Sequence, residues 1–253
     1  MKKAEEVSVI PIPFPTEIRP GDSLAEKLLA AMRFHNLSLK QHDVVVVKHK
    51  IVSKSEDQLV DLATITPSPA SRAWARRYKL DARVVELAVA QSVRIVRRKR
   101  GILITQTRHG FVCANSGVDV SNVDGGTHAL LLPRDPDRSA ARLRSALKRS
   151  LGISVAVIIT DSFGRPWREG LSEVAIGVAG FSPLRDYRGQ RDSHGYPLHA
   201  SIDAVADELA CAAGLVCGKL DRVPAAIIRG FLYHSGRGSA GELIRPARHD
   251  LFR

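Results

Sequence analysis

Three lysines follow a run of four valines at residues 48–54, the first of four polar segments whose residue types suit phosphate or metal chemistry. They are Lys48, Lys50 and Lys54. Ammonium groups at the end of a buried strand can neutralise phosphate oxygens. A charged, solvated strand end without a ligand is the alternative interpretation.

The second and third segments place carboxylates in polar surroundings. Residues 115–126 gather carboxylates, amides and glycines around Asp119, and Asp161 follows an apolar stretch. Hard cations such as Mg²⁺ prefer oxygen ligands, and open α/β sheets bind ligands at the carboxyl ends of their strands. Asp119 and Asp161 are therefore candidate ligands for one or two divalent ions. A solvated turn and a helix cap are the alternatives.

Side chains next to Asp161 can extend this site. Ser162 can add a hydroxyl ligand, and Arg165 and Arg168 suit an anionic substrate because guanidinium groups bind carboxylates and phosphates. The fourth segment, 186–192, is charged, but its spacing indicates no mechanism. Metal ligands and lysines together indicate phosphoryl chemistry on a nucleotide.

The composition limits the partners. Thirty-eight Lys and Arg against 26 Asp and Glu give a net charge of +12, which favours nucleic acid or small phosphorylated molecules. Aromatic residues make up only 5% of the chain, which argues against a stacking platform for single strands. We expect the basic run 97–100 to form a solvated turn between two strands.

We expect a soluble, cytoplasmic protein that binds no membrane. Apolar runs such as 153–160 are far shorter than the roughly 20 residues of a membrane span. The two lysines that follow Met1 precede no apolar segment, which argues against a secretory signal. Cys113, Cys211 and Cys217 lack metal-ligand spacing, and we expect them to be buried, reduced thiols.

The elements that must position these residues indicate a mixed α/β (α+β) fold. The strands and helices alternate without a regular βαβ series, so we expect one domain over 1–253 built from two interleaved α/β subdomains. A capping box at Ser23 and Glu26 and an N-cap at Asp135 each predict the start of a helix. We expect strands at 43–48, 93–96, 101–106, 153–160 and 225–228, and a further helix at 203–216.

Two glycine-rich motifs do not indicate nucleotide binding of the usual kinds. Residues 236–241 match G-x-G-x-x-G, but only 12 residues follow, too few for a dinucleotide fold. A mobile loop that closes over the site, spanning 235–241, is the better interpretation. Residues 214–219 lack the glycine spacing and the hydroxyl residue of a P-loop.

At these same segments the chain resembles the coenzyme F420-0:L-glutamate ligases, also called F420 gamma-glutamyl ligases. Each matching piece is weak alone, and the ordered set is specific. The pieces are Gly21-Asp22-Ser23-Leu24, His49-Lys50-Ile51-Val52-Ser53-Lys54-Ser55-Glu56, Asn115 to Val123, Leu131-Leu132-Pro133-Arg134-Asp135-Pro136-Asp137, Thr160 to Arg168 and Ile228-Arg229-Gly230.

The resemblance implies an F420 ligase-like fold and a GTP-dependent, amide-forming ligase of coenzyme F420 biosynthesis. The lactyl carboxylate of the deazaflavin substrate would be activated by GTP as an acyl phosphate. The α-amine of L-glutamate would then attack, and further glutamates would be added through γ-linkages. The sequence assigns no group to accept the proton that glutamate must lose.

The resemblance also assigns site residues by matching position. Mg²⁺ or Mn²⁺ would be held by Asp119, Asp161 and Ser162. The family also implies K⁺ and an interlocked homodimer. GTP would be contacted by Pro15, Thr16, Glu17, Ile18, His49, Lys50, Lys54 and Asn122.

Two positions depart from the family pattern. Phe14 stands where a glycine is expected, which leaves the local nucleotide contacts open. Lys219 stands where an acid or amide is expected, and a protonated lysine cannot ligate a metal. The chain ends at Arg253, so we also expect no nitroreductase-like C-terminal domain.

Two other functions remain open from the sequence. One is a related ligase that joins an amino acid to another phosphorylated acid. The other is a basic nucleic-acid-binding module, which salt-sensitive binding to arbitrary DNA or RNA without a metal requirement would indicate.

Overall fold

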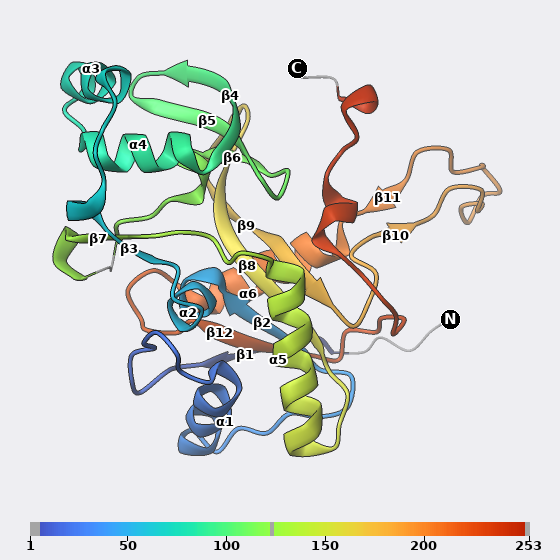
Figure 1. Cartoon of the computed structure of the whole chain (residues 1–253). Helices are drawn as coiled ribbons and strands as arrows, with labels where there is room; N and C mark the ends of the chain where they lie inside the picture. Colours follow the sequence, from blue (N-terminus) through green and yellow to red (C-terminus); the bar gives the residue numbers. More distant parts are fainter. Residues whose placement is uncertain (1–5, 122–123, 251–253) are drawn as a thin grey trace.

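A five-stranded sheet forms the centre of the molecule (Figure 1). The computed structural model describes residues 6–121 and 124–250. The central strands β2 and β8 are parallel, and every other neighbouring pair is antiparallel. The strand order is β1 (Ser8–Ile12), β12 (Ala225–Arg229), β2 (Val44–Lys48), β8 (Ala156–Arg165) and β9 (Arg168–Ala179).

Helices cover both faces of this sheet, as its apolar strands require. Successive side chains of a strand point to opposite faces of the sheet, so the valines of β2 lie on both faces. All four are buried, because helices cover both faces. Val45 and Val47 join one core with helices α1 (Leu24–Phe34) and α5 (Pro136–Leu151). Val44 and Val46 join a second core with α6 (Val205–Cys217). Figure 1 shows α5 in front of the sheet and α6 behind it.

The predicted helix starts are confirmed. The Ser23 hydroxyl accepts a hydrogen bond from the Glu26 amide at 3.4 Å, and Asp135 accepts one from the Arg138 amide at 3.0 Å. Each side chain satisfies an amide that has no partner within its helix. Pro136 then occupies the first helical position, where no amide donor is needed.

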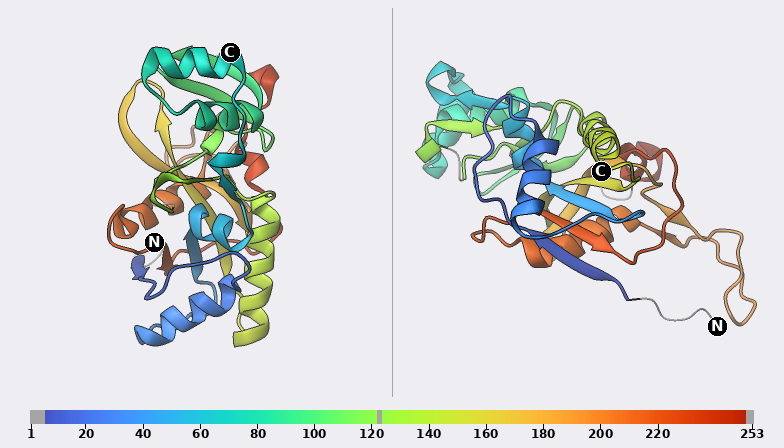
Figure 2. Two further views of the ribbon diagram at one scale, coloured as in Figure 1. Left: turned by 60° about the vertical axis from the view of Figure 1, so that its left-hand side comes forward. Right: turned by 90° about the horizontal axis from the view of Figure 1, so that it is seen from below.

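A smaller region lies beside one end of the central sheet (Figure 2). The prediction that the basic run 97–100 forms a turn was wrong for its first three residues, which belong to β4 because they pair with β5. Arg100 and Gly101, both with positive φ, make the turn to β5. The region contains α3 (Pro69–Tyr78), α4 (Ala82–Ala90), the sheet β4 (Ser92–Lys99), β5 (Ile102–Thr107) and β6 (Val112–Ala114), and the pair β3 (Leu59–Asp61) and β7 (His128–Leu130).

Short elements complete the described chain. Strands β10 (Arg185–Asp186) and β11 (Ile202–Asp203) form the base of an arm that extends away from the central sheet in Figures 1 and 2. Helix α2 (His49–Ser55) follows β2 directly. The 3-10 turns are η1 (Leu62–Thr64), η2 (Asn115–Gly117), η3 (Asp124–Gly126), η4 (Ala240–Leu243) and η5 (Ala247–His249).

The predicted mixed α/β fold class is confirmed, but the predicted bounds of β4 and β8 were wrong, and the largest error is at the end of β8. The apolar run predicts a strand that ends before Asp161, but β8 continues to Arg165. It continues because β9 pairs with it beyond the core, so backbone hydrogen bonds hold the strand where burial no longer does. The division into two subdomains stays a prediction. Over residues 6–121 and 124–250, every helix is too short or too polar to cross a membrane.

The glycine-rich loop at 235–241 lies away from the predicted metal ligands. Ser235 bridges to Phe181, beyond the end of β9 that is distant from Asp161. The loop is anchored to α5, because Asp137 accepts hydrogen bonds from the Ser239 hydroxyl at 2.6 Å and the Ala240 amide at 2.9 Å. This position does not support the predicted closing role.

Candidate active site

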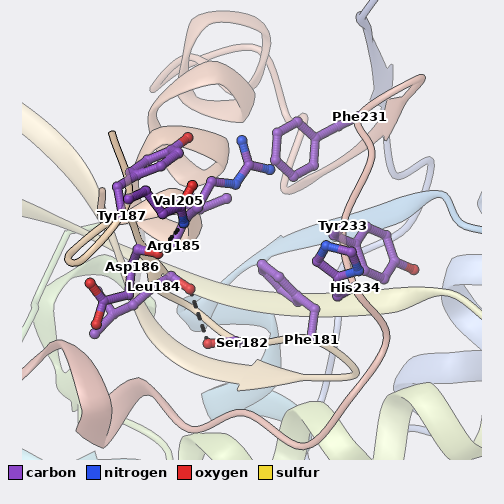
Figure 3. A pocket seen from close by; sticks show the side chains of 11 residues that line it. Phe181, Ser182, Leu184, Arg185, Asp186, Tyr187, Val205, Phe231, Tyr233 and His234 are labelled. Carbon is purple, nitrogen blue, oxygen red and sulfur yellow. Dashed lines mark hydrogen bonds between the residues drawn. The ribbon is translucent and has the colours of Figure 1, made fainter. Parts of the chain in front are cut away.

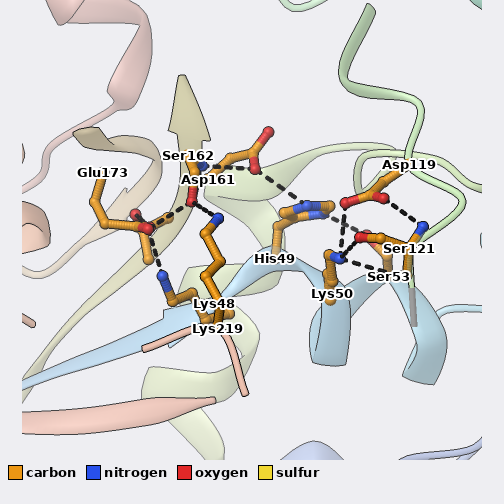
Figure 4. A network of polar contacts seen from close by, with 11 residues as sticks. Lys48, His49, Lys50, Ser53, Asp119, Ser121, Asp161, Ser162, Glu173 and Lys219 are labelled. Atoms are coloured by element: carbon orange, nitrogen blue, oxygen red, sulfur yellow. Dashed lines mark hydrogen bonds and ion pairs between the residues drawn. The ribbon is translucent and has the colours of Figure 1, made fainter. Parts of the chain in front are cut away.

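One edge of the central sheet collects most of the residues predicted to bind metal or phosphate. Since β2 and β8 are parallel, with Lys48 opposite Thr160, the residues that follow them emerge side by side. The loop after β1 and the loop before β12 reach the same edge, because Ile12 pairs with Ala225 and Ala225 with Val47. Four distant parts of the sequence therefore meet there. Figure 4 shows the residues that follow β2 and β8, together with Lys219 and the Asp119 segment.

His49 and Asp161 form the first contact at this edge. The His49 Nε2 lies 3.3 Å from Asp161 Oδ1, and its Nδ1 lies 3.4 Å from the Ser53 hydroxyl one helical turn later. The Asp161 carboxylate also accepts the Ser162 amide at 2.7 Å. His49 is almost fully buried, so the imidazole is fixed in place and holds the carboxylate in one orientation.

Lys50 and Asp119 form the second contact. The Lys50 ammonium lies 2.7 Å from Asp119 Oδ2 and donates to the Ser121 hydroxyl at 2.9 Å. Burial alone would raise the pKa of Asp119, but hydrogen bonds from Lys50 and Ser121 outweigh burial and hold that pKa below its ordinary value. The carboxylate is therefore ionised at neutral pH.

A left-handed turn brings Asp119 to this edge. Asn115, Ser116 and Gly117 all have positive φ, and a side chain on Gly117 would come within 2.8 Å of Leu132. The Ser116 hydroxyl donates to the Ala88 carbonyl at 2.7 Å, which fixes the turn against α4. Asp119 then pairs with Leu130 through two backbone hydrogen bonds. The backbone conformation and packing of this turn therefore explain its polar and glycine residues.

Glu173 is the centre of a third, more buried cluster. Its carboxylate accepts hydrogen bonds from the Thr160 hydroxyl at 2.8 Å and the Ser162 hydroxyl at 2.6 Å, and it pairs with the Lys48 ammonium. Lys219 donates to the Ser162 hydroxyl at 2.9 Å. Burial would raise the pKa of Glu173, but hydrogen bonds from Lys48 and the hydroxyls hold it below its ordinary value.

The remaining predicted nucleotide contacts lie at the same edge or beyond the described residues. Lys54 pairs with Glu17 at 2.5 Å, and the pKa of Glu17 is lowered chiefly by that hydrogen bond. Pro15 and Thr16 are exposed in the same loop. Ile18 is buried in the core, where its side chain packs instead of facing a ligand. Asn122 lies outside the described residues.

The two predicted substrate arginines stand apart from these clusters. Arg165 and Arg168 face each other across the tip of the β8–β9 hairpin, where both are exposed. Arg165 lies four residues beyond Asp161, a separation of about 13 Å along a strand. Its guanidinium donates to the Glu169 carbonyl at 2.8 Å. The structure does not bring these arginines to the carboxylates.

The two carboxylates suit a divalent ion that is held only partly by the protein, and not one that is enclosed by protein ligands alone. Within the described residues there is no group of three or more His, Cys, Asp or Glu side chains placed to hold a metal. Asp119 and Asp161 are nevertheless ionisable oxygen donors beside consecutive residues, Lys50 and His49. Mg²⁺ is usually bound by one or two carboxylates together with water and substrate phosphates. The donor chemistry therefore fits an ion that arrives with a phosphorylated ligand.

Cys113 lies near this site but is not a nucleophile. Burial, and secondarily the charge of Asp161, raise the pKa of its thiol to about 12. A thiol with that pKa stays protonated and unreactive at neutral pH. Cys113 therefore supplies no thiolate nucleophile to this site.

The sequence interpretation did not single out Glu173. The segment 168–179 contains two acids, Glu169 and Glu173, and the sequence alone gives no reason to choose the second. Its importance comes from register, because Glu173 lies directly opposite Ser162 across the β8–β9 pair.

A separate cavity lies at the opposite end of the sheet (Figure 3). It has a volume of about 330 Å³ and is lined by aromatic side chains including Phe181, Phe231 and Tyr233. The Arg185 guanidinium lies over the Phe231 ring, 5.5 Å from its centre. None of the carboxylates described above lines this cavity.

The polar side chains at this edge of the sheet form one group, called here the edge cluster: Glu17, Lys48, His49, Lys50, Lys54, Asp119, Asp161, Ser162 and Glu173. The fold and the edge cluster together define an α/β protein in which cations and carboxylates converge at strand ends. The family model of the F420-0:Gamma-glutamyl ligases matches residues 14–230. The chain belongs to that family, as the ordered motifs predicted.

Curated relatives match over almost the whole chain. A protein named coenzyme F420:L-glutamate ligase from Methanothermobacter thermautotrophicus is 44% identical over 236 residues, which cover 92% of this chain and 93% of the relative. The protein of that name from Methanopyrus kandleri is 44% identical over 248 residues, 96% of both chains. That from Methanocaldococcus jannaschii is 37% identical, covering 100% of this chain and 99% of the relative.

Proposed function

We propose that this protein is a GTP-dependent ligase that joins L-glutamate to the lactyl carboxylate of coenzyme F420-0, with further γ-linked glutamates as possible later additions. The observation that carries the proposal is the placement of Asp119 and Asp161 beside Lys50 and His49 at one sheet edge. Family membership and the shared name of its relatives support the substrate. Coenzyme F420 biosynthesis is then the role of the enzyme.

The chemistry proceeds in two steps. A substrate carboxylate oxygen attacks the γ-phosphorus of GTP, the bond from that phosphorus to GDP breaks, and an acyl phosphate forms. The glutamate amine, after losing a proton, attacks the acyl carbon, and the carbon–oxygen bond to phosphate breaks. The products are an amide, GDP and phosphate.

The residues of the edge cluster have separate roles in this proposal. Lys50 and Lys54 neutralise phosphate oxygens once the ligand displaces or shares their carboxylate partners. Asp119 and Asp161 hold the divalent ion, Mg²⁺ or Mn²⁺. That ion supplies charge neutralisation to the transferring phosphoryl group. His49, already in contact with Asp161, keeps that ligand oriented.

K⁺, the homodimer and the cytoplasmic location belong to this proposal as well. K⁺ and the homodimer are supported by the resemblance alone, the cytoplasmic location is the expectation drawn from the sequence, and no described group is assigned to K⁺. The aromatic rings that would stack single-stranded bases are absent from the charged edge cluster described above, which is built of lysines, carboxylates, histidine and hydroxyls. The ligase is therefore favoured over the nucleic-acid module.

Mass spectrometry of the product tests the proposal. Purified protein is incubated with GTP, Mn²⁺, L-glutamate and F420-0, with single-component omissions as controls. We expect a product heavier by one or more glutamate residues only in the complete mixture. A complete mixture without any glutamylated product contradicts the proposal, and product formed with another acid in place of F420-0 favours the related ligase.

A further inference from the structure

A cation of the chain itself lies beside the hydroxyl that the family resemblance assigns to a metal. The Lys219 ammonium donates to the Ser162 hydroxyl at 2.9 Å, while that hydroxyl donates to Glu173 at 2.6 Å (Figure 4). The single Ser162 proton is thus directed to Glu173, and one oxygen lone pair faces Lys219. A dication at this oxygen would sit against an ammonium group of like charge.

The local backbone places Lys219 there. Helix α6 ends at Gly218, whose φ of +53° and ψ of −165° are accessible almost only to glycine. A side chain on Gly218 would also come within 2.3 Å of the Asp221 carboxylate. The turn directs the next residue toward β8, where the Lys219 ammonium reaches the Ser162 hydroxyl.

Lys219 differs from the other lysines of the site in its partner. Lys48, Lys50 and Lys54 each pair with a carboxylate, namely Glu173, Asp119 and Glu17. Lys219 contacts a neutral hydroxyl, and within the described residues no carboxylate lies within ion-pair distance of its ammonium. Its charge is therefore available to an anionic ligand that enters the site.

We propose that Lys219 is a built-in cation that takes the place of a second divalent ion. On this inference, which rests on the proposed function, the nucleotide-bound chain holds one divalent ion, at Asp119 and Asp161. The Lys219 ammonium, hydrogen-bonded to Ser162, contacts a phosphate oxygen of the nucleotide. Lys219 is thereby a binding residue that sets the metal stoichiometry of the site.

Metal counting tests this inference without a turnover assay. The protein is saturated with a non-hydrolysable GTP analogue, and bound Mn²⁺ per bound nucleotide is measured by equilibrium dialysis with electron paramagnetic resonance of the free ion. We expect one Mn²⁺ for the wild type and two for Lys219→Glu, which removes the cation and adds an oxygen ligand. The carboxylate introduced by Lys219→Glu could disturb the nearby Glu173. Lys219→Asn therefore serves as a second variant, because it adds an oxygen ligand that carries no charge.

Two further variants separate charge from ligation. Lys219→Met should keep one Mn²⁺ and bind the nucleotide about tenfold more weakly, the loss typical of one charge-assisted hydrogen bond. Lys99→Glu, on the exposed end of β4, changes the charge by the same amount as Lys219→Glu. It should match the wild type in both bound Mn²⁺ and nucleotide affinity.

The outcomes distinguish this inference from the proposed function. Two Mn²⁺ in the wild type, or a single Mn²⁺ in both Lys219→Glu and Lys219→Asn, overturns the built-in cation even when the wild type forms the glutamylated product. Failure of the wild type both to bind the nucleotide and to form product overturns the two together.

Discussion

Strand β8 carries different surfaces at its two ends. Near Asp161 and Ser162 the neighbouring side chains are lysines, carboxylates and hydroxyls joined in ion pairs. Near Ala156 the adjoining loops supply Phe181 and Tyr233, whose rings pack 5.4 Å apart, and the aromatic cavity (Figure 3). A triphosphate needs fixed positive charge and oxygen donors, so the proposed phosphoryl chemistry fits the Asp161 end and not the aromatic end.

The largest expected effect is on turnover at the Asp161 end. Asp161→Ala should lower the rate of glutamylated product formation at least about a hundredfold, because the charge that holds the divalent ion is lost. Thermal unfolding should stay close to that of the wild type. Asp203→Ala, at the exposed base of the arm, is the control and should retain its rate. Near-normal turnover of Asp161→Ala would refute its role at the metal.

The second effect is on stability. Glu173→Gln should lower the free energy of unfolding by about 3 kcal/mol, because it leaves the Lys48 ammonium without its counter-ion in a mostly buried position. Chemical denaturation of this variant and of Glu169→Gln, an exposed neighbour on β9, measures the difference. Equal stability of the two variants would mean that the ion pair contributes nothing net.

The same pair gives a pH dependence of stability. The folded pKa of Glu173 lies below its ordinary value of 4.5, so its stabilisation is fully present above that pH and is lost as pH falls through the folded pKa. The free energy of unfolding of the wild type should therefore fall below about pH 4.5, and this loss of stability should be smaller in Glu173→Gln. Parallel pH profiles for the two proteins would assign the acid sensitivity to other groups.

A smaller effect is expected from one phosphate-binding lysine. Lys54→Ala should raise the KM for GTP by about tenfold, because one charge-assisted contact to phosphate is removed while Lys50 remains. Steady-state kinetics at saturating glutamate measures it, with Lys148→Ala on the exposed side of α5 as the control. Unchanged GTP kinetics would count against Lys54 as a phosphate ligand.

The smallest effect is expected at the aromatic end. Arg185→Ala removes the guanidinium that covers Phe231. Because this cavity lies at the opposite end of the sheet from the carboxylates, the KM for GTP should change less than about twofold, within the range of a surface substitution. A large rise in that KM would connect the two ends of β8 and would break the comparison.

The sequence predicted much of the charged end because its signals are local. A valine run followed by lysines located β2, and polar residues after an apolar run located Asp161, but helix α2 was not predicted. Glu173 could not be found in this way, since its partners come from β2, β8 and their register with β9. The continuation of β8 past Asp161 was missed for the same reason, because pairing and not burial sustains it.

Isotope transfer tests the central claim, carboxylate activation by GTP, most directly. The substrate carboxylate is labelled with ¹⁸O, and the phosphate released during amide formation is analysed by mass spectrometry. Attack of that carboxylate on the γ-phosphorus predicts one ¹⁸O atom in each phosphate, because the carbon–oxygen bond breaks when the amine attacks. Glutamylated product accompanied by unlabelled phosphate would contradict the acyl-phosphate account.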